Sequence, residues 1–126
     1  MTIQASDLKA RLPDVTSSLT AELLDDEVTI IRDSYGVPHI KATTAHDAFF
    51  AQGFVTAQDR LFHMDYDRMR ALGRWSEWVG ESALSQDILM RKLGIARAAK
   101  ADLNVSAPAA QAMVRAHTAG INFYLS

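Results

Sequence analysis

Cysteine is absent from this chain of 126 residues. Its absence excludes a disulfide framework, a zinc site built from thiolates and a cysteine nucleophile. Long apolar runs are absent too, since no stretch approaches the roughly 18 apolar residues that a membrane-spanning helix needs. Charged residues near the start interrupt any apolar run of the kind found in a signal peptide: Asp7, Lys9, Arg11 and Asp14. We therefore expect no membrane partner.

An excess of charge of one sign is also missing. Thirteen Lys and Arg stand against 15 Asp and Glu, which leaves a net charge of −2. Without a basic stripe there is no sequence-independent surface for phosphate groups, so we expect no nucleic-acid partner. The fractions of hydrophobic residues (48%) and charged residues (22%) are those of an ordinary folded protein. The length corresponds to one small domain or to a piece of a larger one.

The first 27 residues have a helical pattern. Apolar side chains recur at steps of three and four, as on one face of a helix, at Leu8, Leu12, Val15, Leu19 and Leu23. Pro13 lies inside this pattern and lacks a backbone N–H. We therefore predict an N-terminal helical region over residues 1–27, divided into two short pieces.

Residues 28–42 are predicted to form a β-hairpin. The run at 28–32 is rich in β-branched side chains, which favour a strand. Asp33 and Gly36 then provide turn chemistry, since glycine accepts a positive φ at no steric cost. A second strand follows, in which Pro38 favours the strand start or an edge position because it cannot donate to a ladder.

Residues 44–126 are predicted to be helical. Thr44 followed by Asp47 resembles a capping box with Asp in place of Glu. The helix that begins there carries an apolar stripe at steps of four, three, four and three: Phe50, Phe54, Ala57, Leu61 and Met64. Gly53 lies inside this pattern and permits a bend or the close approach of another element.

Two further helices are expected downstream. A short one, rich in leucine and isoleucine, ends before Gly94. A last helix begins at Pro108 and continues to Ser126 without a residue that would stop it. Because helices in complete domains normally satisfy or cap their final carbonyl groups, we expect that the chain is cut or that residues beyond it are missing.

A row of three side chains is the best candidate for a metal site. Asp59, His63 and Asp67 recur at steps of four, so they lie on one helix face and could supply two or three ligands. The row lies opposite much of the apolar stripe, which favours a solvated or ion-paired face instead. We therefore predict no metal site in this chain.

Other candidate groups also have plainer interpretations. The acidic run at 25–27 could perform acid–base chemistry, but adjacent acids usually form a solvated turn. Trp75 and Trp78 could enclose a ligand, although aromatic residues three apart on a helix are more often packed together. No serine lies in a G-x-S-x-G elbow, and Thr2 could act as an N-terminal nucleophile only without Met1, which is present. The residues alone therefore offer no convincing catalytic group.

Five segments form an ordered series of motifs. Residues 28–40 are similar to I-x-R-D-x-x-G-[VM]-P-H-I, and residues 53–62 to G-[FY]-x-x-A-Q-D-R-L-[FW]. The other three are similar to G-R-x-[SA]-E, D-x-x-x-R-x-x-G and A-G-[IVM]-N and lie at 73–77, 87–94 and 119–122. Through this series the chain resembles the front part of the α chain of penicillin acylases, over roughly residues 28 to 125.

The resemblance implies a fold and an activity. Residues 1–126 would be a single α-chain segment, not an independent domain, of mostly helical α+β structure with one hairpin. This segment would complete the αββα fold of an N-terminal nucleophile hydrolase with a separate β chain cut from the same precursor. The assembly would hydrolyse the amide of an N-acyl compound such as a β-lactam side chain, an acyl amino acid or an acyl-homoserine lactone. The nucleophile would be the first residue of the β chain, a serine, so no catalytic residue is expected in this chain.

The resemblance also implies partners and a setting. The β chain and a small N-acyl substrate are the expected partners. No cofactor is required for the chemistry, and a structural calcium ion in the assembly would have its ligands outside this chain. The protein would be bacterial, in the periplasm or the cytoplasm, since no signal peptide is visible.

The motif residues are interpreted as structural, because buried charges demand partners and both long motifs carry opposite signs. An alternative places His39 at the active site. The residues concerned are Arg32, Asp33, Gly36, Pro38, His39, Gln58, Asp59, Arg60, Gly73 and Glu77.

Two other hypotheses for the whole chain stay open. It could be a non-catalytic helical interaction module that retains the acylase scaffold, or a freestanding domain for a small ligand. A partner chain that begins with serine would favour the acylase. The apolar helix faces argue against a freestanding domain, since so much exposed apolar surface would seek a partner.

Overall fold

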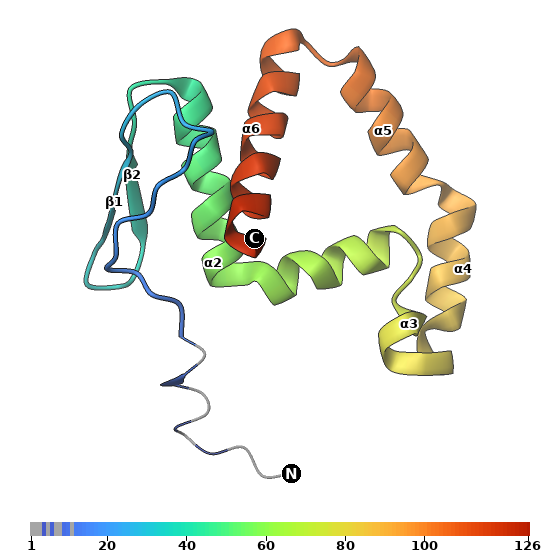
Figure 1. Cartoon of the computed structure of the whole chain (residues 1–126). Coiled ribbons are helices and arrows are strands. Elements are labelled where there is room, and N and C mark those ends of the chain that lie inside the picture. The colour runs from blue at the N-terminus through green and yellow to red at the C-terminus, as the bar shows by residue number, and fades with distance from the viewer. Residues whose placement is uncertain (1–3, 5, 7–8, 11) are drawn as a thin grey trace.

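The computed structural model describes residues 4, 6, 9–10 and 12–126. A two-stranded hairpin is followed by a run of helices (Figure 1). The strands are β1 (Thr29–Arg32) and β2 (Pro38–Lys41). The helices are α2 (Ala45–Ala71), α3 (Ser76–Val79), the 3₁₀ helix η1 (Gly80–Ala83), α4 (Leu84–Leu93), α5 (Ile95–Val105) and α6 (Pro108–Leu125). The prediction of a mostly helical chain with one hairpin is therefore confirmed.

The hairpin forms where the β-branched run and the turn residues predict it, with β1 antiparallel to β2. In the turn, the carboxylate of Asp33 accepts the N–H groups of Tyr35 and Val37 at 2.9 and 3.0 Å. Gly36 has a φ of +79°, which L side chains rarely adopt. Pro38 is the first residue of β2, where its missing N–H is tolerated.

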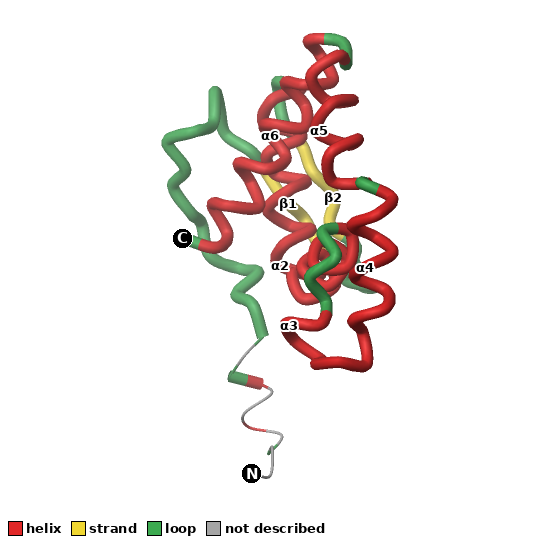
Figure 2. Tube along the Cα trace, turned by 90° about the vertical axis from the view of Figure 1, so that its right-hand side faces the viewer, coloured by secondary structure: helices red, strands yellow, loops and turns green. Residues whose placement is uncertain are grey.

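The core lies between α6 and the first half of α2, which run side by side (Figures 1 and 2). A β-carbon at Gly53 would lie 2.0 Å from the carbonyl oxygen of His117, and one at Gly120 would lie 1.9 Å from that of Phe50. Only glycine fits at such distances. The ring of Phe50 also packs on Phe123, with centroids 5.7 Å apart. The close approach predicted at Gly53 is thus confirmed.

Helix α2 begins as its capping pattern predicts, since the hydroxyl of Thr44 accepts the N–H of Asp47 at 3.0 Å. It is not one straight helix. Arg60 has φ −136° and ψ 19°, and the second half of α2 turns away from the first at this residue (Figure 1). The predicted apolar stripe is buried before the bend, at Phe50 and Ala57, and only partly covered after it.

Residues 12–27, here called the strap, contain no helix. The helical prediction is wrong for this region. Before it, Ser6 and Lys9 are helical, and the N–H of Ala10 donates to the carbonyl of Ser6 at 3.0 Å; Leu8 lies outside the described residues. A short helix gains most of its stability from burying an apolar face. The apolar side chains of the predicted helical face find no such cover within the described chain, since they are 50–72% exposed: Leu12, Val15, Leu19 and Leu23. It runs instead as a loop (Figure 2).

The remaining helices follow the predicted order. Helix α4 ends at Gly94, which has a φ of +69°, and α6 begins at Pro108, as predicted. Helix α5 was not predicted separately, and none of its residues is buried. Within the described part of the chain, no helix combines the length and the apolar character that crossing a bilayer requires.

Candidate functional site

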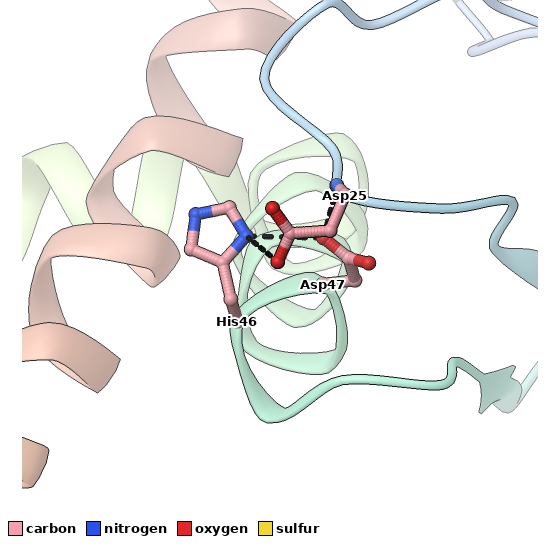
Figure 3. A group of neighbouring side chains, drawn as sticks. All are labelled: Asp25, His46 and Asp47. Atoms are coloured by element: carbon pink, nitrogen blue, oxygen red, sulfur yellow. Dashed lines mark hydrogen bonds and ion pairs between the residues drawn. The ribbon is translucent and has the colours of Figure 1, made fainter.

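The only described group that could hold a metal ion brings together Asp25 of the strap with His46 and Asp47 at the start of α2. Figure 3 shows the three side chains pointing toward one another. Asp47 is fully buried, and its two oxygens accept the N–H groups of Asp25 at 3.0 Å and Asp26 at 3.1 Å. Nδ1 of His46 lies 3.0 Å from the same carboxylate. The cluster therefore fastens the strap to α2.

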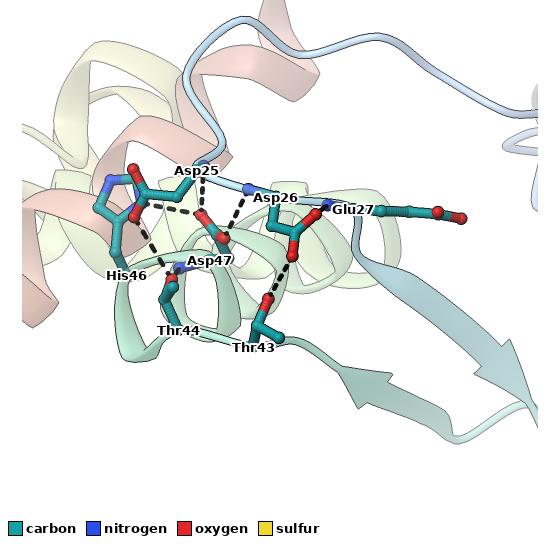
Figure 4. Close-up of polar contacts among 7 residues, drawn as sticks. All are labelled: Asp25, Asp26, Glu27, Thr43, Thr44, His46 and Asp47. Carbon is teal, nitrogen blue, oxygen red and sulfur yellow. Dashed lines mark hydrogen bonds and ion pairs between the residues drawn. The ribbon is translucent and has the colours of Figure 1, made fainter.

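Threonine hydroxyls extend this fastening (Figure 4). Thr43 donates to the carboxylate of Asp26 at 3.0 Å, and Thr44 donates to Asp25 at 3.5 Å. In a capping box the acidic side chain would return to the N–H of the capping residue. Here Asp47 reaches the strap instead. The sequence drew attention to Asp47 because Asp stands in place of Glu in the capping pattern. It did not predict that the N–H groups of the strap would be the partners of this carboxylate.

The electrostatics of Asp47 agree with a structural anion. The backbone N–H of Asp25 lowers the pKa of Asp47 below its ordinary value of 3.8. Burial acts in the opposite direction, but the other donors around the carboxylate outweigh it. The position in the first turn of α2 also favours negative charge, since helix N-termini carry partial positive charge. Asp47 therefore stays ionised at neutral pH.

The donor set does not suit calcium. Calcium takes six to eight oxygen ligands in proteins. Here one of the three side chains offers a ring nitrogen, and both oxygens of Asp47 are already engaged by backbone N–H groups. We therefore assign no calcium chemistry to this cluster.

A second cluster fastens β1 to α2. Arg32 donates through two nitrogens to both carboxylate oxygens of Asp59, at 2.9 and 2.8 Å. It also donates to Oε1 of Gln58 at 2.7 Å and to the carbonyl of Gly36 at 2.9 Å. Gln58 in turn donates to the carbonyl of Asp14 in the strap. The two longest motifs of the sequence thus meet around one guanidinium group.

His39 lies outside these contacts. Its Nε2 is 3.2 Å from the carboxylate of Asp33 on the same hairpin, and its side chain is 64% exposed. The hydrogen bond from His39 and the N–H groups of the turn lower the pKa of Asp33. The pair joins the two arms of the hairpin, and the alternative that His39 acts at an active site finds no second partner among the described residues.

A third cluster joins α4 to the loop before α3. Asp87 is buried and accepts the N–H groups of Trp75 at 3.0 Å and Ser76 at 2.7 Å. Burial raises the pKa of Asp87, but these donors and the charge of Arg91 outweigh it and lower the value overall. Arg91 donates to the carbonyl of Gly73 at 2.8 Å. The D-x-x-x-R spacing therefore lets one helix face hold the loop at two points.

Other predicted residues are not gathered into these clusters. Glu77 pairs with Arg74 in its own helical turn, at 2.7 Å. The row that was considered for a metal is divided, since Asp59 binds Arg32 whereas His63 pairs with Asp67 at 3.4 Å. The ion-paired interpretation of that row is thus confirmed.

The tryptophans pack as expected. The centroids of Trp75 and Trp78 are 5.4 Å apart, and Tyr66 meets Trp75 edge-on at 4.7 Å. Among the described residues, the serine and threonine hydroxyl groups that form hydrogen bonds bond to carboxylates or to backbone groups, and none bonds to a histidine ring. The described residues thus contain no assembled serine–histidine pair.

Comparison with known proteins places these clusters in a family. The model of the penicillin amidase family matches residues 27–126. The chain belongs to the penicillin amidase family. The matched range contains all five motif segments, and the clusters at Arg32, Asp47 and Asp87 all draw on it.

Curated relatives of this penicillin amidase family chain are much longer than it is. It is 44% identical over 119 residues to the penicillin acylase 2 proenzyme of Pseudomonas sp. (strain SE83), a match that covers 94% of this chain and 15% of that protein. It is 37% identical over 114 residues to the acyl-homoserine lactone acylase QuiP of Pseudomonas aeruginosa, covering 90% of this chain and 14% of that protein.

A solved structure of the same family has a similar fold. The thermostable penicillin G acylase from Alcaligenes faecalis, in its tetragonal form, superposes with a TM-score of 0.70 at 28% identity. The match covers 79% of this chain and 53% of that chain. Over the matched part, the arrangement of hairpin and helices is therefore similar to that of this penicillin G acylase.

Proposed function

We propose that this chain is part of an acylase that hydrolyses the amide bond of an N-acyl compound. The observation that carries the proposal is the family match over residues 27–126, supported by identity to proteins named as penicillin and acyl-homoserine lactone acylases. The substrate class proposed is accordingly a linear amide, either the side chain of a β-lactam, an acyl amino acid or an acyl-homoserine lactone.

The proposed chemistry takes place on a second chain from the same precursor. The hydroxyl of its N-terminal serine, with the free α-amine as base, attacks the amide carbonyl, expels the amine and forms an acyl-enzyme. Water then cleaves the ester and releases the acid. The name proenzyme of the relative from strain SE83 supports processing of a precursor. A calcium ion, if the assembly holds one, is proposed to have its ligands outside this chain.

The role proposed for this chain is structural. Among the described residues seven apolar side chains are buried, whereas nineteen large ones are exposed. Such a ratio supports a segment that is completed by another part of the protein, together forming the αββα fold. The clusters around Arg32, Asp47 and Asp87 then keep hairpin, strap and helices in position against that part.

The second candidate is a non-catalytic module that keeps the scaffold. It is favoured by the absence of a serine–histidine pair among the described residues, but that observation is equally expected for a scaffold chain of an active enzyme. The acylase is preferred because the relatives are named as acylases.

Denaturing mass spectrometry of the natively purified protein, with N-terminal sequencing of each chain, tests the proposal. A larger polypeptide that begins with serine and co-purifies with this chain is expected. The preparation should also release the acid from benzylpenicillin or from a long-chain acyl-homoserine lactone, and replacement of that serine by alanine should abolish release. A single species of 13.9 kDa without hydrolysis would contradict the proposal.

A further inference from the structure

Three atoms that can bind a metal converge where the strap meets the start of α2. They are a carboxylate oxygen of Asp25, Nδ1 of His46 and a carboxylate oxygen of Asp47, and all lie within 4.8 Å of one another (Figure 3). Nδ1 of His46 is 3.0 Å from Oδ1 of Asp47 and 3.8 Å from Oδ2 of Asp25. Ligands of a tetrahedral zinc ion lie about 3.3 Å from one another. The three side chains therefore already have nearly the spacing that one small cation needs.

The donor set suits a first-row transition metal. A histidine nitrogen together with carboxylate oxygens is a ligand set of zinc, and three protein ligands leave the fourth tetrahedral position for water. The need for many oxygen ligands, which counts against calcium at this cluster, does not apply to zinc.

Asp47 can bind a metal ion without releasing the strap. A carboxylate oxygen has two lone pairs, and each oxygen of Asp47 gives one of them to a backbone N–H, from Asp25 or from Asp26. Oδ1 is also within hydrogen-bond distance of Nδ1 of His46. A metal ion would take the place of the hydrogen between these two atoms. His46 would then bind as a neutral ring with its hydrogen on Nε2, the nitrogen that points away from both carboxylates in Figure 3.

The charge of the cluster favours a divalent cation. Asp47 is fully buried and stays ionised at neutral pH, and Asp25 brings a second carboxylate to the same point. Together with a neutral imidazole, the two carboxylates carry about two negative charges, which one divalent cation cancels. The side chains of Asp25 and His46 are 64% and 43% exposed, so an ion can enter from solvent.

The structure singles out this cluster. In the part of the chain that it describes, no other group of three such side chains converges. Two further histidine–aspartate pairs there lack a third ligand, namely His39 with Asp33 and His63 with Asp67. The prediction of no metal site considered ligands within single segments, whereas this cluster needs Asp25 from the strap.

We propose that Asp25, His46 and Asp47 form a binding site for a divalent transition metal ion such as zinc, and that the bound ion clamps the strap to α2. Each of the three side chains would supply one ligand atom, and water would be the fourth ligand. The inference goes beyond the proposed function and does not depend on it, because all three ligands belong to this chain.

Crystals of the natively purified protein soaked in zinc chloride test the site directly. Anomalous scattering measured on both sides of the zinc absorption edge should locate one ion at this cluster. The expected distances are about 2.0–2.2 Å to Nδ1 of His46 and to one oxygen each of Asp25 and Asp47. The absence of zinc at the cluster, or an ion held by fewer than these three side chains, would overturn the proposal.

Two matched pairs of variants measure the affinity in solution, by calorimetric titration with zinc. Asp25→Asn removes a ligand but keeps the backbone N–H of that residue, and its control is Asp26→Asn, where the carboxylate bonds to a threonine instead. His46→Gln removes the nitrogen ligand, and its control is His63→Gln on the same helix. Each ligand variant should weaken zinc binding at least about tenfold, and each control less than about twofold. A ligand variant that binds zinc as tightly as its control would overturn the proposal.

Hydrogen exchange at the N–H groups of Asp25 and Asp26 tests the clamp. Saturating zinc should slow their exchange at least about tenfold in the native protein, because the ion binds the closed strap more tightly than the open one. In the His46→Gln variant, zinc at the same concentration should leave the exchange unchanged. Exchange in the native protein that zinc does not slow, or equal slowing in both proteins, would overturn the clamp.

Discussion

The two halves of α2 contrast sharply in how they are covered. Before Arg60 the helix is enclosed by α6, the hairpin and the strap, and most of its buried residues lie there. After Arg60 only Met69 is buried, and Phe62 projects into solvent. The first half is covered by contacts within the chain, whereas most of the second half remains uncovered by the described residues. One helix therefore serves both as a core element and as an exposed arm.

The close contact between α6 and the first half of α2 depends on Gly53 and Gly120. Gly120→Ala is therefore expected to have the largest effect on stability. The new β-carbon would lie 1.9 Å from the carbonyl oxygen of Phe50, which forces α6 away from the first half of α2. Overpacking of this kind costs up to about 3 kcal/mol in the free energy of unfolding. Urea denaturation of the purified protein measures it. Ala112→Ser, on an exposed part of α6, is the control and should change stability by less than about 0.5 kcal/mol.

The next largest effect is expected from Asp47→Asn, which removes the anion that holds the strap on the first half of α2. An asparagine can accept from only one of the N–H groups of Asp25 and Asp26, and its own N–H₂ opposes the other. Hydrogen exchange at those two amides should accelerate by about tenfold or more. Unchanged exchange there, with a normal fold, would show that the strap is held by other contacts.

The same anchor should respond to acid. Because folding lowers the pKa of Asp47 below 3.8, its contribution to stability is present above that pH and is lost as the pH falls through the lowered value. Exchange at Asp25 and Asp26, corrected for the intrinsic rate, should therefore be constant from about pH 7 to 5 and rise only below about pH 4. A rise that already begins above pH 5 would show that a group other than Asp47 controls the strap.

A smaller effect is expected from Arg32→Lys, which keeps the charge at the junction of hairpin and α2 but loses the paired bonds to Asp59. Lysine cannot reproduce the fork that binds both carboxylate oxygens together with Gln58. We expect a loss of about 1–2 kcal/mol in the free energy of unfolding. If the Arg32→Lys variant is as stable as the native protein, the bonds from Arg32 to Asp59 and Gln58 do not stabilise the junction of hairpin and α2.

The smallest effect is expected from His39→Gln. This side chain is largely exposed and pairs only with Asp33, away from α2. The kcat/KM for amide hydrolysis by the assembled acylase should stay within about twofold, as for a surface change outside the site. A fall of a hundredfold with unchanged stability would restore the alternative that places His39 at the active site.

The local features follow from the sequence alone. The β-branched run and Gly36 specify the hairpin, Thr44 starts α2, and Gly94 ends α4, because each depends on a residue's own conformational preferences and on neighbours a few positions away. The ordered motifs also predicted the family. Among the candidate residues, the pairing of opposite charges suggested that Arg32 would find a carboxylate, but not which one.

The remaining features depend on how distant segments pack together. The carboxylate of Asp47 accepts a backbone N–H from a residue 22 positions earlier in the chain. Gly53 and Gly120 allow α2 and α6 to come into close contact, and α2 bends at Arg60. The strap has a helical pattern yet remains a loop, since Leu12, Leu19 and Leu23 of that pattern stay exposed in the described chain. Each outcome depends on contacts between distant segments, and propensity along the chain carries no information about which surface will be available for burial.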